Sequence, residues 1–343
     1  MSVTVQYLQA SDEDAWNSYV KLHKQGSPFH LTSWRDAISR AFGHNSLYLG
    51  AWKGDKLCGI LPLTHVKSFL FGNILSSVAF AAYGGPLADD SSIRDALLSA
   101  AGKEAKKRNA DYVELKWKET VDCELPGNDL YVTFVKELSS DHDENLKAIP
   151  RKQRAMVRKG IKSDLKPHVG NEYLDAFYDI FSVNVHRLGT PVYGKNWFEA
   201  LLTTFDKNAE ILVVEYQGKI ISGVFTIYFK DTVLPYYAAS LVEYRKYAPN
   251  DFQYWTLMQR AVEKGCRYFD FGRSKKGTGQ FNFKKHWGFT PRQLDYRYIL
   301  NRAEEVPAIN PLNPRYKRKI EMWRKLPLPI TRLAGPHIVK YIP

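Results

Sequence analysis

The chain of 343 residues contains few cysteines and no long apolar run. These two features limit the classes of protein to which it can belong. Its three cysteines, Cys58, Cys123 and Cys266, are scattered without metal-site spacing, and their odd number argues against a disulfide framework. No apolar run approaches the ~18 residues that span a bilayer, and the first residues lack the basic and apolar regions of a signal peptide. We therefore expect a reduced, cytoplasmic protein, large enough for two domains and without a metal site.

Acidic residues are scarce in two segments, and these segments carry the whole net charge of +13. Residues 147–166 contain eight Lys or Arg against one acid, and residues 301–343 contain nine against three. The rest of the chain is balanced. Positive charge concentrated in this way indicates anionic partners such as phosphates, RNA or lipid headgroups.

The two halves of the chain repeat one pattern. Residues 47–66 and 211–229 each read as two strands joined by a hairpin. Each half continues with a further strand, a helix and a final strand, and the final strands lie at 111–117 and 267–273. This order favours a mixed, mostly antiparallel sheet flanked by helices in each half, so the expected fold class is α+β with two copies of one domain.

The repeat sets the expected boundaries. Domain 1 should span 1–145, domain 2, which should hold the main active site, 146–300, and a basic, proline-containing tail 301–343. Helical segments are expected at 12–22, 33–42, 93–109, 171–186, 196–205 and 250–264. In one of them, Trp197, Leu201 and Phe205 form an apolar stripe that should lie in the core.

A cationic helix is expected where the two halves join. Pro150 interrupts or restarts a helix there. Four cations that follow it recur at three- and four-residue spacing and should share one helical face: Arg151, Arg154, Arg158 and Lys162. This face is a candidate phosphate-binding surface. The alternative is a solvated basic helix docked on the seam between the domains.

The segment Tyr268–Phe289 carries the densest set of candidate site residues. An aromatic strand runs into a glycine loop, and a helix-like segment follows. Polar residues at the end of a buried strand are a common way to build a site. The cations of this segment would bind an anionic substrate group, unless the loop is only a solvated basic turn: Arg273, Lys275, Lys276, Lys284 and Lys285.

Several motifs occur in a fixed order along residues 1–300. The first half contains Ser27-Pro28-Phe29-His30 with Trp34, and Tyr83-Gly84-Gly85-Pro86-Leu87. The second half contains the basic helix, His186-Arg187-Leu188-Gly189-Thr190-Pro191 with Trp197-Phe198, then Tyr236-Tyr237-Ala238-Ala239-Ser240, and Phe283-Lys284 before Gly288-Phe289. Together they resemble the FemAB group of aminoacyl transferases, whose fold is a tandem of acyl-CoA N-acyltransferase (GNAT) domains. The tail is similar to that of FemAB-like proteins accompanying exosortase (PEP-CTERM) and exopolysaccharide gene clusters.

The resemblance implies a function. Family members of known activity move an amino acid from aminoacyl-tRNA to an amine on a peptidoglycan precursor linked to a nucleotide or lipid. This chain would then be an N-acyltransferase with aminoacyl-tRNA as donor and no tightly bound cofactor. Its acceptor would be an amine of an envelope, exopolysaccharide or peptidoglycan-type precursor. Its partners would be tRNA, which the basic helix would face, and an anionic glycan or lipid-linked precursor, in the cytoplasm or at the inner face of the cytoplasmic membrane.

The same resemblance assigns roles in catalysis and substrate binding. Lys284 would stabilise the oxyanion, whereas Lys285 lies about 100° away on a helix, so only one of the two can face the site. Arg187 would bind a phosphate of the acceptor, because a guanidinium binds phosphate in a bidentate manner. Its alternative is a contact with the carbonyls at a helix end.

Three further residues are candidates for the site. Tyr237 and Ser240 lie at the end of the strand 232–240, beside the cleft of this fold, where Tyr237 is either catalytic or buried core. Asp270 is the one carboxylate of an aromatic strand. It would accept a proton or pair with Arg273.

Two other functions stay open. An acyl-CoA-dependent N-acyltransferase on the same fold is one. Related acetyl-CoA enzymes bind the pyrophosphate in a glycine-rich turn before a helix, whereas residues 240–252 contain no glycine, which disfavours CoA. A non-catalytic tandem domain that binds nucleic acid or an anionic glycan precursor is the other.

The tail mixes apolar and cationic residues. Residues 315–325 read as a short basic amphipathic segment, and apolar residues with few acids follow it. Such a segment suits peripheral contact with an anionic membrane, or it packs against domain 2. Pro327 and Pro329 should prevent one long helix.

Overall fold

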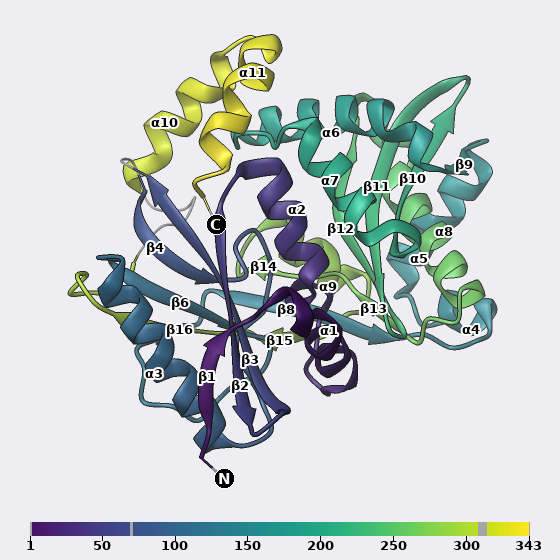
Figure 1. Cartoon of the computed structure of the whole chain (residues 1–343). Coiled ribbons are helices and arrows are strands. Elements are labelled where there is room, and N and C mark those ends of the chain that lie inside the picture. The colour runs from purple at the N-terminus through teal and green to yellow at the C-terminus, as the bar shows by residue number, and fades with distance from the viewer. Residues whose placement is uncertain (1, 69–70, 308–313, 343) are drawn as a thin grey trace. The chain divides into compact units, whose positions relative to one another are not determined.

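The computed structural model describes residues 2–68, 71–307 and 314–342 (Figure 1). The chain folds into two compact units. Unit 1 is built from Met1–Tyr131, Gln293–Asn313 and His337–Pro343, and unit 2 from Val132–Arg292 and Pro314–Pro336. Residues 308–313 of the expected proline-containing tail lie outside the described residues.

Unit 1 is a mixed sheet with helices packed on it. The strand order is β1-β2-β3-β4-β6-β16-β7, with β5 beside β3, and the pairs are antiparallel except β4 with β6. The strands are β1 (Thr4–Tyr7), β2 (Asn45–Lys53), β3 (Lys56–Ser68), β4 (Gly72–Ser77), β5 (Leu87–Ala88), β6 (Tyr112–Trp117), β7 (Gly127–Asn128) and β16 (Asp295–Leu300). The helices are α1 (Glu13–Leu22), α2 (Thr32–Phe42) and α3 (Ser91–Lys107).

Unit 2 repeats this plan. Its strand order is β14-β8-β13-β12-β11-β10-β9, with β15 beside β8, and β12 is parallel to β13. The strands are β8 (Tyr131–Glu137), β9 (Lys166–Val169), β10 (Ala209–Tyr216), β11 (Lys219–Phe229), β12 (Thr232–Ser240), β13 (Tyr268–Asp270), β14 (Ser274–Lys275) and β15 (Pro291–Gln293). The helices are α4 (His142–Lys147), α5 (Arg151–Lys162), α6 (Leu174–Leu188), α7 (Lys195–Phe205), α8 (Pro249–Glu263), α9 (Gly279–His286), α10 (Pro314–Lys325) and α11 (Leu328–Val339).

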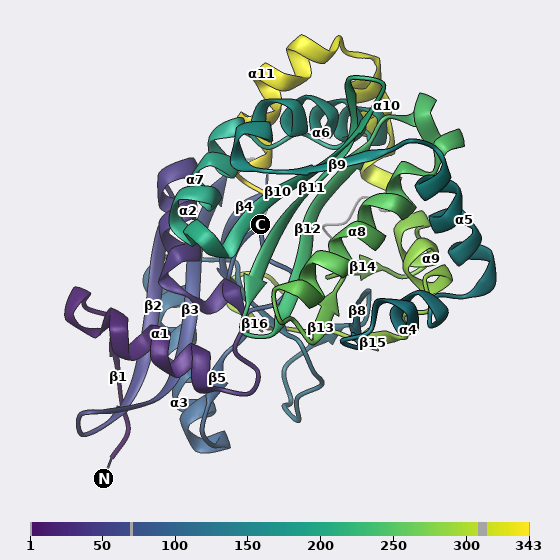
Figure 2. The same ribbon diagram turned by 90° about the vertical axis from the view of Figure 1, so that its right-hand side faces the viewer.

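Helices cover both faces of the sheet of unit 2. Helices α6 and α7 lie on one face, and α8 lies on the other with α5 outside it (Figures 1 and 2). The stripe of Trp197, Leu201 and Phe205 on α7 is buried, as its four-residue spacing predicts. Pro150 precedes the first residue of α5 and separates this helix from α4.

The two units confirm the expected fold. In each, an antiparallel hairpin (β2–β3 or β10–β11) is followed by a strand, a helix and a strand that pairs in parallel. This is the predicted α+β tandem with mixed, mostly antiparallel sheets.

One strand of each sheet comes from the other half of the sequence. β16 pairs with β6 in unit 1, and β8 pairs with β13 in unit 2. The boundary expected at 145/146 assigns β8 to domain 1, although β8 pairs in the sheet of unit 2. It assigns β16 to domain 2, although β16 pairs in the sheet of unit 1. The sequence pattern indicates which residues form a strand, whereas the choice of partner depends on the assembled sheet.

Candidate active site

The segment that links β13 to α9 holds Lys284 inside unit 2. The side chain is 9% exposed. Its Nζ donates to the carbonyls of Phe271 (2.7 Å), Gly272 (3.0 Å) and Arg273 (3.2 Å). Gly272 has a φ of +66°, a conformation that favours glycine, and it turns the chain as it leaves the strand. Lys284 therefore ties the helix to the loop that follows β13.

The neighbouring lysine points elsewhere. Lys285 is exposed, and its Nζ lies 5.7 Å from the centre of the Phe281 ring. Lys284 shares its buried helical face with Trp287, three residues further on. Of the two lysines, Lys284 is the one enclosed by the protein.

Burial lowers the pKa of Lys284 from 10.5 to about 7. The negative charge of Asp270 opposes this shift, and the positive charge of Arg273 adds to it. The three carbonyl acceptors match the three hydrogens of the ammonium form and so favour the charged state. A lysine that titrates near neutrality can act as a cation toward an oxyanion or as an amine that takes up a proton.

Asp270 lies beneath this loop. It is 1% exposed, and its Oδ1 accepts hydrogen bonds from Thr133 Oγ1 (3.1 Å) and from the backbone N–H of Gly272 (2.8 Å). A carboxylate that accepts the N–H two residues ahead stabilises a turn. Asp270 thus fixes the loop whose carbonyls hold Lys284.

A hydrogen-bonded tyrosine pair lies in the same unit. The indole N–H of Trp197 donates to the hydroxyl of Tyr237 (3.0 Å), which is also hydrogen-bonded to Tyr193. Burial raises the pKa of both tyrosines, that of Tyr193 to about 12, and the positive charge of Arg273 opposes the shift at Tyr193. The guanidinium of Arg273 therefore acts on Tyr193.

The other two predicted substrate ligands lie at the end of a strand and in the last turn of a helix. Ser240 is the last residue of β12, nearly buried, opposite Ser222 of β11. Arg187 is exposed in the last turn of α6, where its Nη2 donates to Asn184 Oδ1 (3.0 Å). Within the described residues, the structure gives no contact between Arg187 and Lys284.

The four predicted phosphate-binding cations line one surface pocket. Arg151, Arg154, Arg158 and Lys162 of α5, with Lys159, surround a concavity of about 660 Å³. The lining contains no acidic residue. The structure therefore brings together every residue predicted for this face, and it adds Lys159.

The opposite face of α5 docks on the start of α8. A Cβ added to Gly160 would lie 2.7 Å from Cβ of Phe252, so only glycine allows the two helices to approach this closely. Asp251, near the first turn of α8, is buried, and burial raises the pKa of its carboxyl. Its Oδ1 accepts hydrogen bonds from Gln153 of α5 and from the indole N–H of Trp287 (3.1 Å). The start of α8 is thus covered by protein and carries a carboxylate.

Two of these residues were not predicted from the sequence. Tyr193 lies between the motif that ends at Pro191 and Trp197. Its position next to these two motifs is the one sequence signal that could have indicated it as a site residue. Asp251 lies in the segment without glycine, two residues after the proline that opens a helix. Sequence spacing does not reveal their hydrogen-bond partners.

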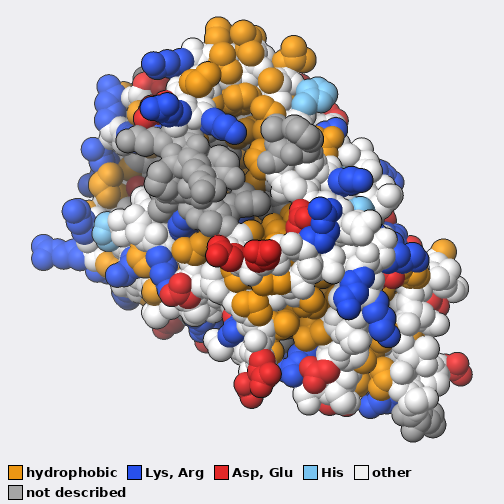
Figure 3. Space-filling view, turned by 90° about the vertical axis from the view of Figure 1, so that its left-hand side faces the viewer, with side chains coloured by type: hydrophobic (Ala, Val, Ile, Leu, Met, Phe, Trp, Pro, Cys, Tyr) orange, Lys and Arg blue, Asp and Glu red, His pale blue; other side chains and the backbone are white. Residues whose placement is uncertain are grey.

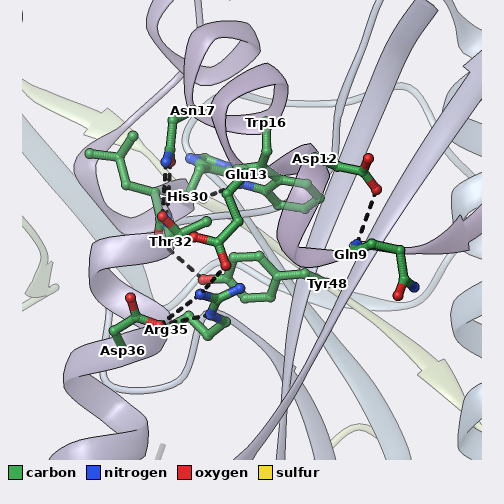
Figure 4. A network of polar contacts seen from close by, with 11 residues as sticks. Gln9, Asp12, Glu13, Trp16, Asn17, His30, Thr32, Arg35, Asp36 and Tyr48 are labelled. Atoms are coloured by element: carbon green, nitrogen blue, oxygen red, sulfur yellow. Dashed lines mark hydrogen bonds and ion pairs between the residues drawn. The ribbon is translucent and has the colours of Figure 1, made fainter. Parts of the chain in front are cut away.

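In unit 1, the first-half motifs serve packing. His30 is buried, and its ring contacts Ser27 Oγ (2.7 Å) and the carbonyl of Gly85 (2.9 Å). Trp16 donates to the carbonyl of His30 (2.7 Å), as Figure 4 shows. In the same network Arg35 pairs with Glu13 and Asp36. These contacts connect α1, α2 and the segment between them.

The described residues contain neither a cluster suited to a metal ion nor a helix suited to crossing a membrane. No group of three or more His, Cys, Asp or Glu side chains there is arranged to hold a metal ion. None of the helices in this part of the chain combines the length and apolar character needed to span a bilayer.

Comparison with known proteins finds a family model that matches part of the chain. Residues 145–285 match the family model described as "Acetyltransferase (GNAT) domain". The chain is 31% identical over 120 residues to the lipid II:glycine glycyltransferase of Staphylococcus saprophyticus, which covers 32% of this chain and 29% of that protein. It is 30% identical over 131 residues to the Staphylococcus aureus protein of the same name, with 35% and 31% covered. The chain therefore matches only about a third of the length of these relatives.

Solved structures support the fold over most of the chain. The crystal structure of FemX superposes with a TM-score of 0.66 at 16% identity and covers 92% of this chain and 99% of FemX. A tandem GNAT protein from the clavulanic acid biosynthesis pathway has a TM-score of 0.56 at 10% identity, with 87% and 98% covered. At these identities the likeness concerns the fold alone. The likeness shows a tandem GNAT-like fold, and the sequence matches show that part of the chain is similar to lipid II:glycine glycyltransferases.

Proposed function

We propose that this chain is an acyltransferase that moves an aminoacyl group from aminoacyl-tRNA to an amine of a cell-envelope precursor. The observation that carries the proposal is the buried Lys284, held by three carbonyls at the end of β13 within the segment that matches the GNAT domain. A buried lysine with a pKa near neutrality is unusual for a structural role and common at reaction centres.

In the proposed reaction, the neutral amine of the acceptor attacks the ester carbonyl of the aminoacyl-tRNA. A C–N bond forms, negative charge develops on the carbonyl oxygen, and the C–O bond to the terminal ribose breaks. The ribose hydroxyl leaves with the proton that the amine gives up. Catalysis requires a group that stabilises the oxyanion and a path for that proton.

Lys284 would stabilise the oxyanion by exchanging one of its hydrogen bonds. All three hydrogens of its ammonium form point to backbone carbonyls. The contact with the carbonyl of Arg273 is the longest, at 3.2 Å, so it is the one that a charged oxygen would replace. Loss of one fixed donor to an oxyanion lowers rates by ~10²–10³.

The tyrosine pair would position the reacting groups. Its hydroxyls are too weakly acidic to act as anions at neutral pH, because burial raises the pKa of both. Tyr237 and Tyr193 can hold the acceptor amine or pass its proton along their hydrogen bond, beside Arg273. Asp270 supports this arrangement by fixing the loop. The roles of Arg187, Ser240 and Lys285 as substrate ligands stay predictions.

The surroundings of α8 favour tRNA over CoA as the donor. Acetyl-CoA enzymes of this superfamily bind the pyrophosphate at a helix N-terminus. The corresponding start of α8 carries the Asp251 carboxylate and lies under α5. A carboxylate there repels phosphate, whereas the outer face of α5 offers a cationic pocket of about 660 Å³ to a nucleic-acid backbone.

The donor is tested by binding. We would compare charged tRNA, uncharged tRNA and acetyl-CoA on the purified protein at about 50 and about 200 mM salt. The proposal expects charged tRNA to bind more tightly than uncharged tRNA and both to weaken strongly with salt. Tight binding of acetyl-CoA with no preference for charged tRNA would reject it in favour of acyl-CoA chemistry.

Catalysis is tested with Lys284→Met. Methionine fills a similar volume without a charge. We would measure transfer of a radiolabelled amino acid from tRNA to hydroxylamine, a small amine in place of the acceptor, and to lipid II. We expect donor binding to persist and transfer to fall by ~10²–10³. Equal transfer by the variant would remove Lys284 from the reaction. No transfer by the wild type above the rate without protein would favour a non-catalytic domain that binds nucleic acid or glycan.

The acceptor and location follow from the relatives and from the chain's own tail. An acceptor amine on a lipid-linked precursor agrees with the lipid II:glycine glycyltransferases that the chain resembles. An acceptor amine on an envelope or exopolysaccharide glycan agrees with the resemblance of the tail to FemAB-like proteins that accompany exopolysaccharide gene clusters. In either case the chain would work in the cytoplasm, where charged tRNA is present, near the inner face of the membrane.

A further inference from the structure

The two C-terminal helices α10 and α11 are bonded to α6. Helix α10 meets the end of α6, where Arg324 Nη2 donates to the carbonyl of Leu188 (3.0 Å). Helix α11 is held by Arg332, which donates to Ser182 Oγ (2.8 Å) and pairs with Asp179 (2.8 Å). These contacts fix which sides of the two helices face the protein.

Large apolar side chains of both helices, and of the turn between them, are exposed. Leu333 is 76% exposed, Met322 69% and Ile330 48%, and Leu326 is also exposed in the turn between the helices. Few large apolar residues of the described chain are exposed at all, and four of them fall within the twelve residues 322–333. Figure 3 shows apolar side chains gathered at the top of the view, over α10 and α11. We call Met322, Leu326, Ile330 and Leu333 the apolar ridge.

Cations accompany the ridge. Between residues 318 and 333 the chain has five Lys or Arg and one acid, Glu321. Arg332 and Arg324 are both bonded to residues of α6. Arg318, Lys319 and Lys325 are exposed. Lys and Arg side chains lie beside the apolar cluster in Figure 3.

We propose that the apolar ridge and its exposed cations dock the protein on the surface of an anionic lipid bilayer. Exposed apolar side chains beside lysine and arginine are the combination that binds at the headgroup level of such a membrane. Each cation near an anionic surface adds to the binding, and each apolar tip adds by entering the acyl boundary. A protein partner would need matching acidic pockets, whereas a bilayer accepts protruding side chains without a fixed shape.

The bend between α10 and α11 suits this role. The helices end and begin around Pro327, so the ridge consists of two short segments held on α6 and is not one free amphipathic helix. The side chains protrude from a folded support, which limits the conformational entropy lost on binding. Trp323 is only partly exposed and is not counted in the apolar ridge.

Vesicle binding tests this proposal independently of the proposed catalysis. The wild-type protein is mixed with vesicles of equal parts phosphatidylglycerol and phosphatidylcholine, or of phosphatidylcholine alone, and the bound fraction is measured by sedimentation. We expect binding to the anionic vesicles only, and a loss of most of it in about 0.5 M salt. No substrate is present, so failure of the acyl-transfer proposal would not affect the result.

Two variants with matched controls assign the surface. Met322→Gln/Leu333→Gln should weaken binding about tenfold to a hundredfold, and Lys319→Gln/Lys325→Gln about thirtyfold. Leu22→Gln, which replaces another exposed apolar residue, and Lys207→Gln should leave it unchanged. All of these side chains are exposed, so thermal unfolding should be the same for each variant.

Three outcomes would overturn the proposal. One is a wild-type protein that does not bind anionic vesicles. Another is binding that persists in both ridge variants, which would place the membrane contact on a different cationic surface. The third is a wild-type dimer that becomes a monomer in Met322→Gln/Leu333→Gln, because the ridge would then be an interface between two copies of the chain.

Discussion

Lys284 should make the folded protein more stable as the pH rises above neutrality. Burial lowers its pKa from 10.5 to about 7, so between these values the unfolded chain binds a proton that the folded chain does not. Stability rises with pH wherever the unfolded state binds more protons. The gain is about 1.4 kcal/mol per pH unit, up to roughly 5 kcal/mol at the upper end of the window. Below about pH 7 the lysine is charged in both states and adds no slope.

Comparison with Lys284→Met isolates this effect, since methionine does not titrate. Urea unfolding of both proteins would be followed by circular dichroism at about pH 6, 7, 8 and 9. The free energy of unfolding of the wild type, relative to the variant, should be flat up to about pH 7 and then rise by about 1.4 kcal/mol per unit. Lys284→Arg is the matched control, because its guanidinium stays charged throughout and its difference from the methionine variant should not depend on pH.

Parallel pH profiles of the wild type and Lys284→Met would refute the lowered pKa. The three carbonyl contacts would then outweigh burial, and Lys284 would be a permanent cation at physiological pH. The two cases also differ in catalysis. If the ammonium form is active and titrates near 7, transfer by the wild type falls above neutrality, whereas residual transfer by Lys284→Arg does not.

The basic pocket, the tyrosine pair and the contact between α5 and α8 each give a further prediction. Arg154→Gln/Arg158→Gln should reduce the slope of log affinity for tRNA against log salt by about two in filter binding, and an unchanged slope would remove the pocket from the tRNA interface. Tyr237→Phe should leave the bonded indole N–H without its acceptor and destabilise the fold by about 1–3 kcal/mol in urea unfolding. Gly160→Val should push α5 from α8 and cost about 1–3 kcal/mol, whereas Ala155→Val on the exposed face should change stability little.

Periodicity was sufficient to predict the features that depend on local geometry. The repeated order of hairpin, strand, helix and strand predicted the α+β tandem. Three- and four-residue spacing predicted that the cations of α5 share one face, and they line one pocket. The 100° step of a helix predicted that Lys284 and Lys285 diverge, and one is buried while the other is exposed.

Features that depend on partners far apart in the sequence could not be predicted in this way. The pairing of β16 with β6 joins residues more than a hundred positions apart, and the sequence of neither strand identifies its partner. The same holds for Tyr193, whose importance rests on its bond to Tyr237 and its place near Arg273. Lys284 was predicted as a donor to an oxyanion, but its bonds to three carbonyls emerge only from the loop conformation.

The two repeats share a feature that bears on the choice of donor. In each, a helix follows the hairpin and third strand, and its N-terminus is the place where CoA enzymes of this superfamily bind pyrophosphate. In unit 1, Asp90 caps α3 and accepts the N–H of Ile93 (2.9 Å). In unit 2, Asp251 is buried near the first turn of α8 and bonded to Gln153. Both N-termini therefore already have a carboxylate where a phosphate would bind, and neither dipole is free to attract an anion.

This arrangement links the two faces of α5 in the proposed function. Its inner face covers the start of α8, where CoA would bind, and its outer face carries the cations proposed to bind tRNA. Removing the cations would therefore weaken tRNA binding without restoring CoA binding, because Asp251 and the docked helix would remain. A change of donor from CoA to tRNA would require the carboxylate, the close packing at Gly160 and the basic face together, and one helix supplies the last two.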